Sequence, residues 1–312
     1  MSKYLITGGA GFIGSNIAIK LVKEGKKVRI LDNFFTGRKE NIAPIIQKIE
    51  LIEGDIKDFQ TCLKAVDGVK YVLHQAALPS VPRSIRDPIT TNETNVTGTL
   101  NILIAARDKK VRRIIYASSS SVYGANPDLP KQEEMKSFPL SPYAVSKLVG
   151  EHYCQVFHQI YGLETVILRY FNVFGPNQDP ASQYAAVIPK FIKTMLEKNQ
   201  PTIYGDGKQS RDFTYIDNVI QANLLAVYAK NACGKVFNIA SQKRVTINDL
   251  VRILNKILKT NIEPIYTEPR PGDVRHSLAD ISRAKKILGY HPTVGFEEGL
   301  EKTVSWFREK LK

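Results

Sequence analysis

The 312-residue sequence has few cysteines and no apolar run that approaches the ~20 residues of a membrane-spanning helix. Cys62, Cys154 and Cys233 are odd in number and show no metal-ligand spacing, so we expect free thiols in a reducing compartment and no metal site. A strand-like run begins almost at the first residue, without the pattern of a signal peptide. We therefore expect a cytoplasmic protein with no membrane partner.

Long blocks of one charge are also missing, although 44 lysines and arginines against 30 acidic residues give a formal net charge of +14. The basic residues are scattered, as at Lys109-Lys110 and Lys285-Lys286, and they do not alternate with aromatic residues as in a stacking surface for nucleic acid. We expect a solvated basic surface and no nucleic-acid partner. The same positive field would attract an anionic substrate.

The N-terminus carries a glycine pattern between a strand and a helix. The apolar run 3–7 leads into Gly8-Gly9-Ala10-Gly11-Phe12-Ile13-Gly14 and then into an amphipathic stretch. Such glycines allow a tight turn and close approach of a dinucleotide pyrophosphate to the helix N-terminus. A second strand, 27–31, ends in Asp32, where an acid binds the ribose hydroxyls and repels a 2′-phosphate. The pattern predicts an NAD site, and Arg38 leaves NADP as the minor alternative.

Tyr143 and Lys147 stand four residues apart, in Ser-Pro-Tyr-Ala-Val-Ser-Lys at 141–147. Positions i and i+4 of a helix share one face, so the phenol and the ammonium can reach one pocket. A phenol with a pKa near ~10 is a poor base at neutral pH, but a neighbouring cation lowers that pKa. The pair predicts a tyrosine general base that acts on an alcohol or sugar hydroxyl.

Strand-like and helix-like stretches alternate along the chain. Further strands are expected at 50–52, 71–74, 114–117 and 165–169, and helices near 57–66, 91–109 and 146–161. This alternation predicts an α/β fold in which a doubly wound parallel sheet of the Rossmann type is covered by helices on both faces. We expect a nucleotide-binding domain at 1–175, rejoined by about 212–242 through a strand at 236–240, and a smaller C-terminal substrate lobe at 176–312. Ligands should bind beyond the carboxyl ends of the strands.

Several motifs together resemble one family over essentially the whole chain. They are the glycine run 7–14, Ser118-Ser119-Ser120-Ser121-Val122-Tyr123-Gly124, the Tyr143/Lys147 motif, Arg169-Tyr170-Phe171-Asn172-Val173-Phe174-Gly175-Pro176 and Gly205-Asp206-Gly207 with Arg211-Asp212-Phe213. In this order they resemble the extended short-chain dehydrogenase/reductases that epimerise nucleotide sugars. The stretches 80–84, 177–180 and 184–189 are similar to those of the UDP-N-acetylglucosamine 4-epimerases.

The resemblance implies a role for each matching residue. NAD would contact Gly8, Gly11, Phe12, Ile13, Gly14, Asp32, Asn33, Asp55, Ile56, Gln75, Ala76, Ala77, Asn95, Tyr143, Lys147 and Tyr170. The UDP-sugar would contact Ser80, Arg83, Ser119, Asn172, Val187, Tyr204, Arg211, Arg270, Asp273 and Ser277. Catalysis would rest on Tyr143, Lys147 and a serine, with Ser119 the better match and Ser120 the alternative. His74 is interpreted as a structural histidine.

The implied activity is interconversion of UDP-N-acetylglucosamine and UDP-N-acetylgalactosamine, with UDP-glucose and UDP-galactose also used. Oxidation at C4 by tightly held NAD would be followed by rotation of the 4-keto sugar and re-reduction. Ser277 matches the position that gates the C2 substituent, and a small residue there leaves room for an acetamido group. The resemblance also implies a homodimer formed through helices near 91–109 and 146–161.

Three alternatives remain open. A UDP-glucuronate 4-epimerase or decarboxylase would use the surplus of arginines to bind a C6 carboxylate. A nucleotide-sugar 4,6-dehydratase needs an acidic pair where this chain has Ser120-Ser121, so it is less favoured. A non-catalytic NAD-binding protein on the same fold is disfavoured because Tyr143 and Lys147 are both present.

Overall fold

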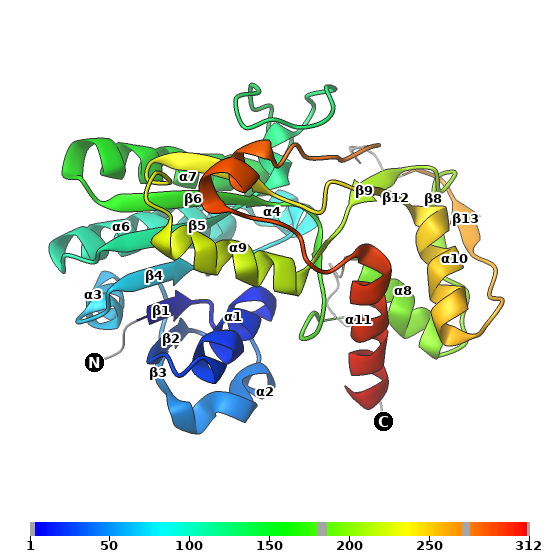
Figure 1. Ribbon diagram of the computed structural model, residues 1–312, viewed down its shortest axis with the longest axis horizontal. Coiled ribbons are helices and arrows are strands. Elements are labelled where there is room, and N and C mark those ends of the chain that lie inside the picture. The colour runs from blue at the N-terminus through cyan, green and yellow to red at the C-terminus, as the bar shows by residue number, and fades with distance from the viewer. Residues whose placement is uncertain (1–3, 180–185, 270–274, 311–312) are drawn as a thin grey trace.

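A parallel sheet forms the centre of the larger half of the molecule. The structure is a computed structural model that describes residues 4–179, 186–269 and 275–310, and within these ranges seven strands form one sheet in the order β11-β6-β5-β4-β1-β2-β3 (Figure 1). The strands are β1 Tyr4–Thr7, β2 Val28–Asp32, β3 Ile49–Glu53, β4 Tyr71–His74, β5 Arg113–Ser119, β6 Glu164–Tyr170 and β11 Lys235–Ile239. The chain starts in the middle and winds outward in both directions, which confirms the predicted doubly wound α/β fold.

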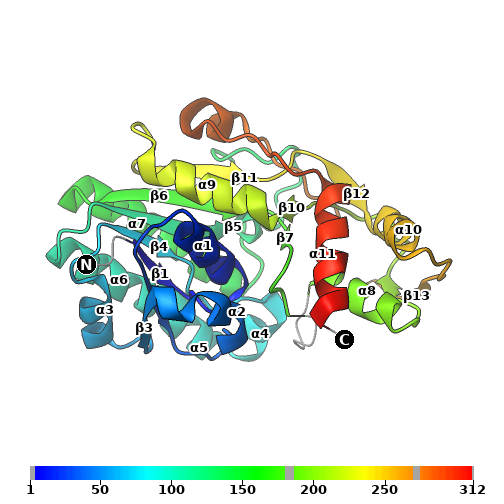
Figure 2. The ribbon, with the colours of Figure 1, turned by 60° about the horizontal axis from the view of Figure 1, so that its bottom comes forward.

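Helices cover both faces of this sheet (Figure 2). On one face lie α1 (Phe12–Lys23) and α9 (Ile216–Tyr228), and on the other lie α3 (Phe59–Val66), α6 (Gly98–Asp108) and α7 (Pro142–Tyr161). Successive strand residues serve opposite cores: Leu73 packs with the α1 side, whereas Val72 packs with the α3 and α6 side. Burial on both faces explains why the central strands β1 and β4 are mostly apolar and do not alternate with polar residues, whereas the edge strand β3 carries two exposed glutamates.

The expected strands are present, and two expected helices differ at their starts. The helix expected at 91–109 consists of α5 (Pro88–Asn92), a π-helical segment η2 (Glu93–Thr97) and α6. The helix expected at 146–161 begins earlier, at Pro142, because proline suits the first turn and the Ser141 hydroxyl caps it by accepting the Ala144 amide at 3.2 Å. Tyr143 and Lys147 therefore both lie on α7.

The smaller half lies beside the sheet and carries α8, α10 and α11 (Figures 1 and 2). Its helices are α8 (Val187–Leu196), α10 (Ile247–Leu258) and α11 (Phe296–Lys310). Two-stranded sheets pair β8 (Thr202–Tyr204) with β13 (Ile265–Thr267), β9 (Ser210–Asp212) with β12 (Arg244–Thr246), and β7 (Val173–Phe174) with β10 (Thr214–Tyr215). The apolar core of this lobe is continuous with the core on the α1 side of the main sheet.

The chain enters the C-terminal lobe after β6 and returns to the main sheet with β11, which pairs in parallel with β6. The strand predicted at 236–240 is this β11. The remaining short helical segments are α2 Lys39–Ile42, η1 Ala43–Lys48, α4 Val81–Arg86, η3 Ser120–Tyr123 and η4 Ala284–Leu288. Over the described ranges, no helix combines the length and apolarity needed to cross a membrane.

Candidate active site

A cleft of about 850 Å³ lies at the carboxyl ends of the strands. It is lined by these predicted site residues: Gly8, Gly11, Phe12, Ile13, Gly14, Asp32, Asn33, Asp55, Ile56, Gln75, Ala76, Ala77, Ser80, Arg83, Tyr143, Lys147 and Tyr170. These residues come from the turn after β1, the ends of β2, β3 and β4, the start of α4, the first turns of α7 and the end of β6. The fold thus brings together the residues predicted to bind a dinucleotide, as expected for a switch point in strand order.

The turn after β1 leaves no room for side chains. A Cβ on Gly14 would lie 2.2 Å from the Gly8 carbonyl oxygen, and a Cβ on Gly8 would lie 2.8 Å from the Ala76 backbone. Gly8 also has φ +66°, a left-handed conformation that favours glycine. Gly11 stands at the N-cap of α1 and cannot cap it with a side chain, so the first amides of the helix are available to an anion. This cradle fits the pyrophosphate of a dinucleotide.

Acidic and amide side chains line the cleft at the ends of β2 and β3. The Asp32 carboxylate accepts the Ala10 and Phe34 amides, each at 2.8 Å, and burial raises its pKa. The Asn33 amide donates to the Asp55 carboxylate at 3.0 Å. Hydrogen bonds therefore fix Asp32 against the glycine turn, at the position predicted to bind the ribose.

The segment after β4 forms another wall of the cleft. The Gln75 amide donates to the Tyr170 hydroxyl at 3.2 Å, and Asn223 on α9 donates to the same hydroxyl at 2.9 Å. Asn95, in the π-helical segment η2, lies behind this wall and hydrogen-bonds both backbone groups of Leu78, with its amide oxygen 2.7 Å from the Leu78 nitrogen. Asn95 is thus placed to order the wall from outside the cleft.

Tyr143 and Lys147 occupy the first turns of α7, at the ends of β5 and β6. The Lys147 ammonium donates to the Ala117 carbonyl of β5 at 2.9 Å and lies 6.0 Å from the centre of the Tyr143 ring. The Ser119 hydroxyl, at the end of β5, is close enough to the Tyr143 phenol to act on its pKa. The three predicted catalytic groups are therefore adjacent.

The electrostatics of this pair differ from the prediction. We expect from the sequence that Lys147 lowers the Tyr143 pKa, but the surrounding protein desolvates the phenol and raises that pKa, and only the Ser119 hydrogen bond opposes the rise. Burial also lowers the Lys147 pKa to about 8. The expectation of a lowered Tyr143 pKa is wrong for the protein alone, because desolvation of the buried phenol is the largest influence on that pKa.

The four serines after β5 have different surroundings. The Ser118 hydroxyl donates to the Glu151 carboxylate of α7 and so faces away from Tyr143. Ser119 accepts the Ser121 amide at 3.2 Å, which leaves its own proton available for Tyr143. Ser120 begins the short helix η3. The contact with Tyr143 favours Ser119 over Ser120 as the catalytic serine.

Three of the residues predicted to bind substrate, Asn172, Arg211 and Ser277, lie on or beside β9. The Asn172 amide donates to the Asp212 carbonyl at 3.1 Å and to the Ser277 hydroxyl at 3.3 Å, and the Ser277 amide donates to the Ser210 carbonyl at 3.0 Å. Asn172 has φ +38°, an uncommon conformation for a residue other than glycine. Strand β9 therefore joins Asn172 to a serine more than a hundred positions later in the chain.

The other predicted substrate residues have separate positions. Arg211 lies on β9 and donates to the Arg275 carbonyl at 3.2 Å, while Val187 begins α8 directly after Ala186, which lines the cleft. Tyr204 ends β8. Arg270 and Asp273 fall outside the described residues.

The sequence singles out Arg211 and Arg38 but does not predict the charged residues that gather around each of them. Arg211, Arg244 and Arg275 lie near His276 and, after desolvation, lower its pKa, while Asp206 opposes them and pairs with Arg275 at 3.3 Å. Arg38 and Asp179, which both line the cleft, form an ion pair at 2.6 Å. Pairing of β9 with β12 brings Arg211 and Arg244 together, and Arg38 meets Asp179 across 141 positions of the chain, so no local pattern predicts either grouping.

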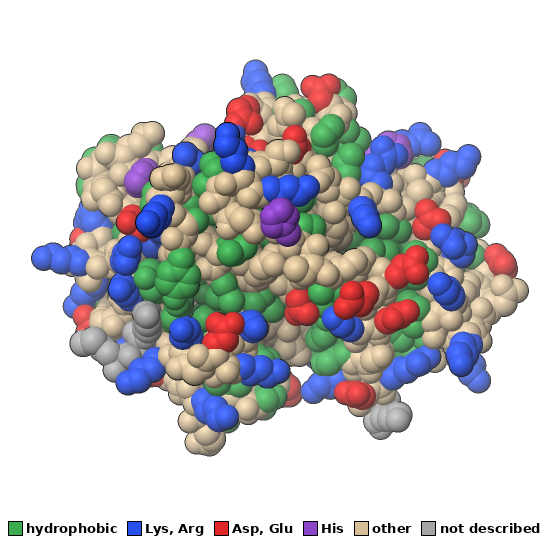
Figure 3. Space-filling model, viewed as in Figure 1, with side chains coloured by type: hydrophobic (Ala, Val, Ile, Leu, Met, Phe, Trp, Pro, Cys, Tyr) green, Lys and Arg blue, Asp and Glu red, His purple; other side chains and the backbone are tan. Residues whose placement is uncertain are grey.

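His74 occupies a buried position within the sheet, as its interpretation as a structural residue requires. Its Nδ1 is 2.6 Å from the Thr7 hydroxyl and its Nε2 is 3.0 Å from the Thr99 hydroxyl, and burial lowers its pKa to about 3. In the part of the chain that the structure describes, no three or more histidine, cysteine or acidic side chains gather as metal ligands. The face in Figure 3 shows lysines and arginines spread among acidic side chains.

Comparison with known proteins adds an independent line of evidence. The model of a family described as "NAD dependent epimerase/dehydratase family" matches residues 4–240. The UDP-N-acetylglucosamine 4-epimerase of Methanobrevibacter ruminantium, solved with UDP-N-acetylmuramic acid, is 43% identical, with 99% of each chain covered and a TM-score of 0.95. The UDP-glucose 4-epimerase of Thermotoga maritima, solved with UDP-glucose, is 38% identical, with a TM-score of 0.94 and 99% and 100% coverage.

A third similar structure contains both a substrate and a cofactor. The UDP-glucuronic acid 4-epimerase of Bacillus cereus, solved with UDP-glucuronic acid and NAD, is 36% identical, with 99% of each chain covered and a TM-score of 0.91. The likeness to all three proteins therefore extends over the sheet and the C-terminal lobe alike.

Proposed function

The chain belongs to the NAD dependent epimerase/dehydratase family, and on that premise we propose that it interconverts UDP-N-acetylglucosamine and UDP-N-acetylgalactosamine. At the coarser level it is an NAD-dependent UDP-sugar 4-epimerase, an isomerase. We propose further that it accepts UDP-glucose and UDP-galactose. The observation that carries the proposal is the placement of Tyr143 and Lys147 together in the lining of the cleft, with Ser119 next to the Tyr143 phenol.

Each of these three side chains has a chemical task. Tyr143, as phenolate, removes the proton from the sugar's 4-hydroxyl and returns it once the sugar has turned its other face. Ser119 donates a hydrogen bond to the oxygen on which charge develops. Lys147, held by the Ala117 carbonyl, binds the nicotinamide ribose and supplies positive charge for the phenolate.

The glycine turn and the surrounding wall would hold the cofactor. The amides at the start of α1 would bind the pyrophosphate, Asp32 the adenosine ribose, and Gln75 and Tyr170 the nicotinamide end of the cleft. NAD, when bound, accepts the hydride from C4 and gives it back to the opposite face. Because each turnover regenerates it, the cofactor should stay with the protein and not exchange like a second substrate.

The proposed preference for N-acetylated sugars depends on residues of the C-terminal lobe. Ser277 is small, is hydrogen-bonded to Asn172 and lies beside β9, so it leaves space where a bulky side chain would stand. The solved relative with the highest identity given above acts on an N-acetylated sugar, which supports the same choice. Arg211 would bind the diphosphate with its planar guanidinium.

A second candidate is a UDP-glucuronate 4-epimerase. The three arginines around His276 are a specific observation in its favour, because a C6 carboxylate would be attracted to the same positive region. It ranks second, because those arginines equally suit the diphosphate that every UDP-sugar carries.

We propose that the protein is a homodimer that pairs through α7 and its neighbours. Val145, Val156 and Ile160 form an apolar stripe on the exposed side of α7, and Ile85 and Ile89 are 63% and 71% exposed on the adjacent α4 and α5. A patch of this kind commonly marks an interface. Light scattering on a size-exclusion column tests it, and Ile89→Lys with Ile160→Lys should give a monomer.

The function itself is tested without added cofactor. Purified protein should be incubated in parallel with UDP-N-acetylglucosamine, UDP-glucose and UDP-glucuronate and followed by NMR at the anomeric proton. Equilibration of the first with its C4 epimer supports the proposal, and equilibration of UDP-glucuronate alone supports the second candidate. Turnover that appears only with added NAD would contradict a retained cofactor.

A further inference from the structure

Helix α7 is tied to strand β5 at two successive points. One turn of the helix carries Lys147, whose ammonium donates to the Ala117 carbonyl at 2.9 Å. The next turn carries Glu151, whose carboxylate accepts the hydroxyl of Ser118, the following residue of β5. Helix residues four apart therefore contact strand residues one apart, and this arrangement sets both the rotation and the axial position of α7 on the sheet.

Glu151 is also held by the neighbouring strand. Arg169 lies opposite Ser118 in the pairing of β5 with β6, and its Nε and Nη2 donate to the two oxygens of Glu151 at 2.9 and 2.7 Å. The side chains of this pair are 5% and 2% exposed. A bidentate arginine–carboxylate contact fixes orientation more strictly than a single hydrogen bond.

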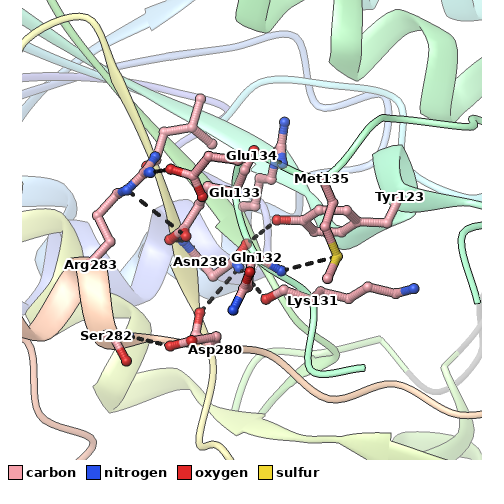
Figure 4. A network of polar contacts seen from close by, with 12 residues as sticks. Tyr123, Lys131, Gln132, Glu133, Glu134, Met135, Asn238, Asp280, Ser282 and Arg283 are labelled. Carbon is pink, nitrogen blue, oxygen red and sulfur yellow. Dashed lines mark hydrogen bonds and ion pairs between the residues drawn. The ribbon is translucent and has the colours of Figure 1, made fainter. Parts of the chain in front are cut away.

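Arg169 is fixed in turn from its other side. Its guanidinium lies 4.7 Å from the centre of the Tyr123 ring, and it donates to the Glu133 carbonyl at 3.3 Å. The Tyr123 hydroxyl donates to the side-chain oxygen of Asn238 on β11 at 2.7 Å, and the backbone N–H of Asn238 donates to the Glu133 carboxylate at 2.8 Å. Figure 4 shows Tyr123, Asn238 and Glu133 pointing toward one another in this network. The support for Glu151 thus extends across β5, β6 and β11.

A buried ion pair is a poor source of stability, because removing two charges from water costs about as much as their attraction returns. The same two strands carry another arginine–glutamate pair at their amino ends, where Arg113 donates at 2.8 Å to Glu164, which is partly exposed and does not line the cleft. That pair ties no residue of α7. The Arg169–Glu151 pair differs because Glu151 belongs to α7, the helix that carries Tyr143 and Lys147, so this pair joins that helix to the sheet.

We infer that Glu151 is a positioning residue: it fixes the part of α7 that carries Tyr143 and Lys147 on the carboxyl ends of β5 and β6. Burial lowers the Lys147 pKa, and the charges of Cys154 and Glu151 oppose that fall. The inference rests on the proposed function, because it assumes that these two side chains perform the chemistry. The titratable groups that face Lys147 are Tyr143, Glu151 and Cys154 on α7, Tyr116 on β5 and His74 on β4.

The test compares Glu151→Gln with Glu164→Gln, the matched change at the amino ends. In Glu151→Gln we expect kcat to fall about 10- to 100-fold, because small displacements of reactive groups are costly, while KM for the UDP-sugar stays within about twofold. The alkaline limb of the kcat profile should move down by about one pH unit, because Lys147 loses its neighbouring negative charge. The NAD content of the purified protein, read from its absorbance after denaturation, should also fall.

Glu164→Gln should lower the melting temperature yet leave the pH profile and the NAD content at wild-type values. Should Glu151→Gln fail to fold because Arg169 is left unpaired, the double variant Glu151→Gln with Arg169→Gln takes its place, with the same expected results. Should that fail as well, Glu151→Asp carries the test. Asp keeps the charge but shortens the reach, so kcat should fall with the alkaline limb unmoved.

A Glu151 variant that matches Glu164→Gln, with kcat within about twofold and an unmoved alkaline limb, would overturn the inference. If Glu151→Asp is the variant that has to be used, a wild-type kcat in it would overturn the inference. Tyr143→Phe should be measured beside these variants. Full activity in Tyr143→Phe defeats the proposed function itself, whereas an inactive Tyr143→Phe beside a silent Glu151 variant defeats the positioning role alone.

Discussion

The cofactor half and the C-terminal lobe build their parts of the site in different ways. At the glycine turn the contact surface is backbone. The turn is packed so closely that a Cβ on Gly14 would lie only 2.2 Å from the Gly8 carbonyl oxygen. In the lobe the contacts come from side chains of distant segments, such as Asn172 and Ser277. We infer that the first region serves every UDP-sugar alike, whereas the second distinguishes among them.

The largest expected effect is that of Gly14→Ala in the cofactor half. The new methyl group would overlap the Gly8 carbonyl, and backbone cannot move aside as a flexible side chain can. We expect a loss of about 3 kcal/mol in the free energy of unfolding, purified protein without NAD and no measurable turnover of any sugar. Urea unfolding and cofactor extraction measure both.

Gly295→Ala is the matched control. Within the described residues, no atom lies within 4 Å of a Cβ at that position, so stability and NAD content should remain at wild-type values. If Gly14→Ala retained NAD at full occupancy, the backbone of the turn would have to shift to accommodate the methyl group, which would contradict the prediction.

Tyr143→Phe should follow, with kcat reduced at least ~10²-fold for both N-acetylated and plain sugars, the usual effect of losing a general base. KM should change little, because the phenol ring remains and the hydroxyl acts mainly in the transition state. Steady-state kinetics with both kinds of sugar provide the measurement. A loss confined to one sugar would place Tyr143 among the specificity residues instead.

A contrast between local and long-range contacts, present within the cofactor half itself, governs what the sequence could predict. Local patterns suffice for the glycine turn and Asp32, because their geometry depends on residues close together in the chain. The spacing of Tyr143 and Lys147 predicts their shared helix face, but not the raised Tyr143 pKa, which depends on burial by other segments. Arg169 and Glu151 look in the sequence like ordinary charged residues, and only the pairing of β5 with β6 reveals them as a buried pair.

Ser277→Tyr in the lobe should have a smaller and selective effect. A tyrosine there would overlap an acetamido group, so kcat/KM for the N-acetylated pair should fall about 10- to 100-fold while the plain hexoses keep most of theirs. Ser277→Ala, which removes only the hydroxyl that accepts the Asn172 amide, is the control and should retain both activities. Equal losses for both pairs would remove Ser277 as the gate.

The smallest expected effect concerns stability alone: one buried residue in each half should change the free energy of unfolding in opposite directions as the pH falls. His74 has a pKa of about 3 in the folded protein and about 6.5 when unfolded, so its contribution to stability is lost as pH falls below the unfolded value. Asp212 on β9 has its pKa raised to about 6 by burial, so its contribution grows as pH falls through 6 toward the unfolded value near 3.8. Lowering the pH from 7 to 5 should therefore cost about 2 kcal/mol through His74 and return about 1 kcal/mol through Asp212.

Urea unfolding at the two pH values, with His74→Gln and Asp212→Asn, isolates these terms. The His74 variant should lose less stability than wild type on acidification, because no neutral ring remains to be protonated on unfolding. The Asp212 variant should lose more, because its gain has been removed. The comparison uses the change between pH values, so any constant destabilisation from the substitution itself cancels. Two variants that shift the acid response in the same direction would show that the halves do not carry opposite titrations.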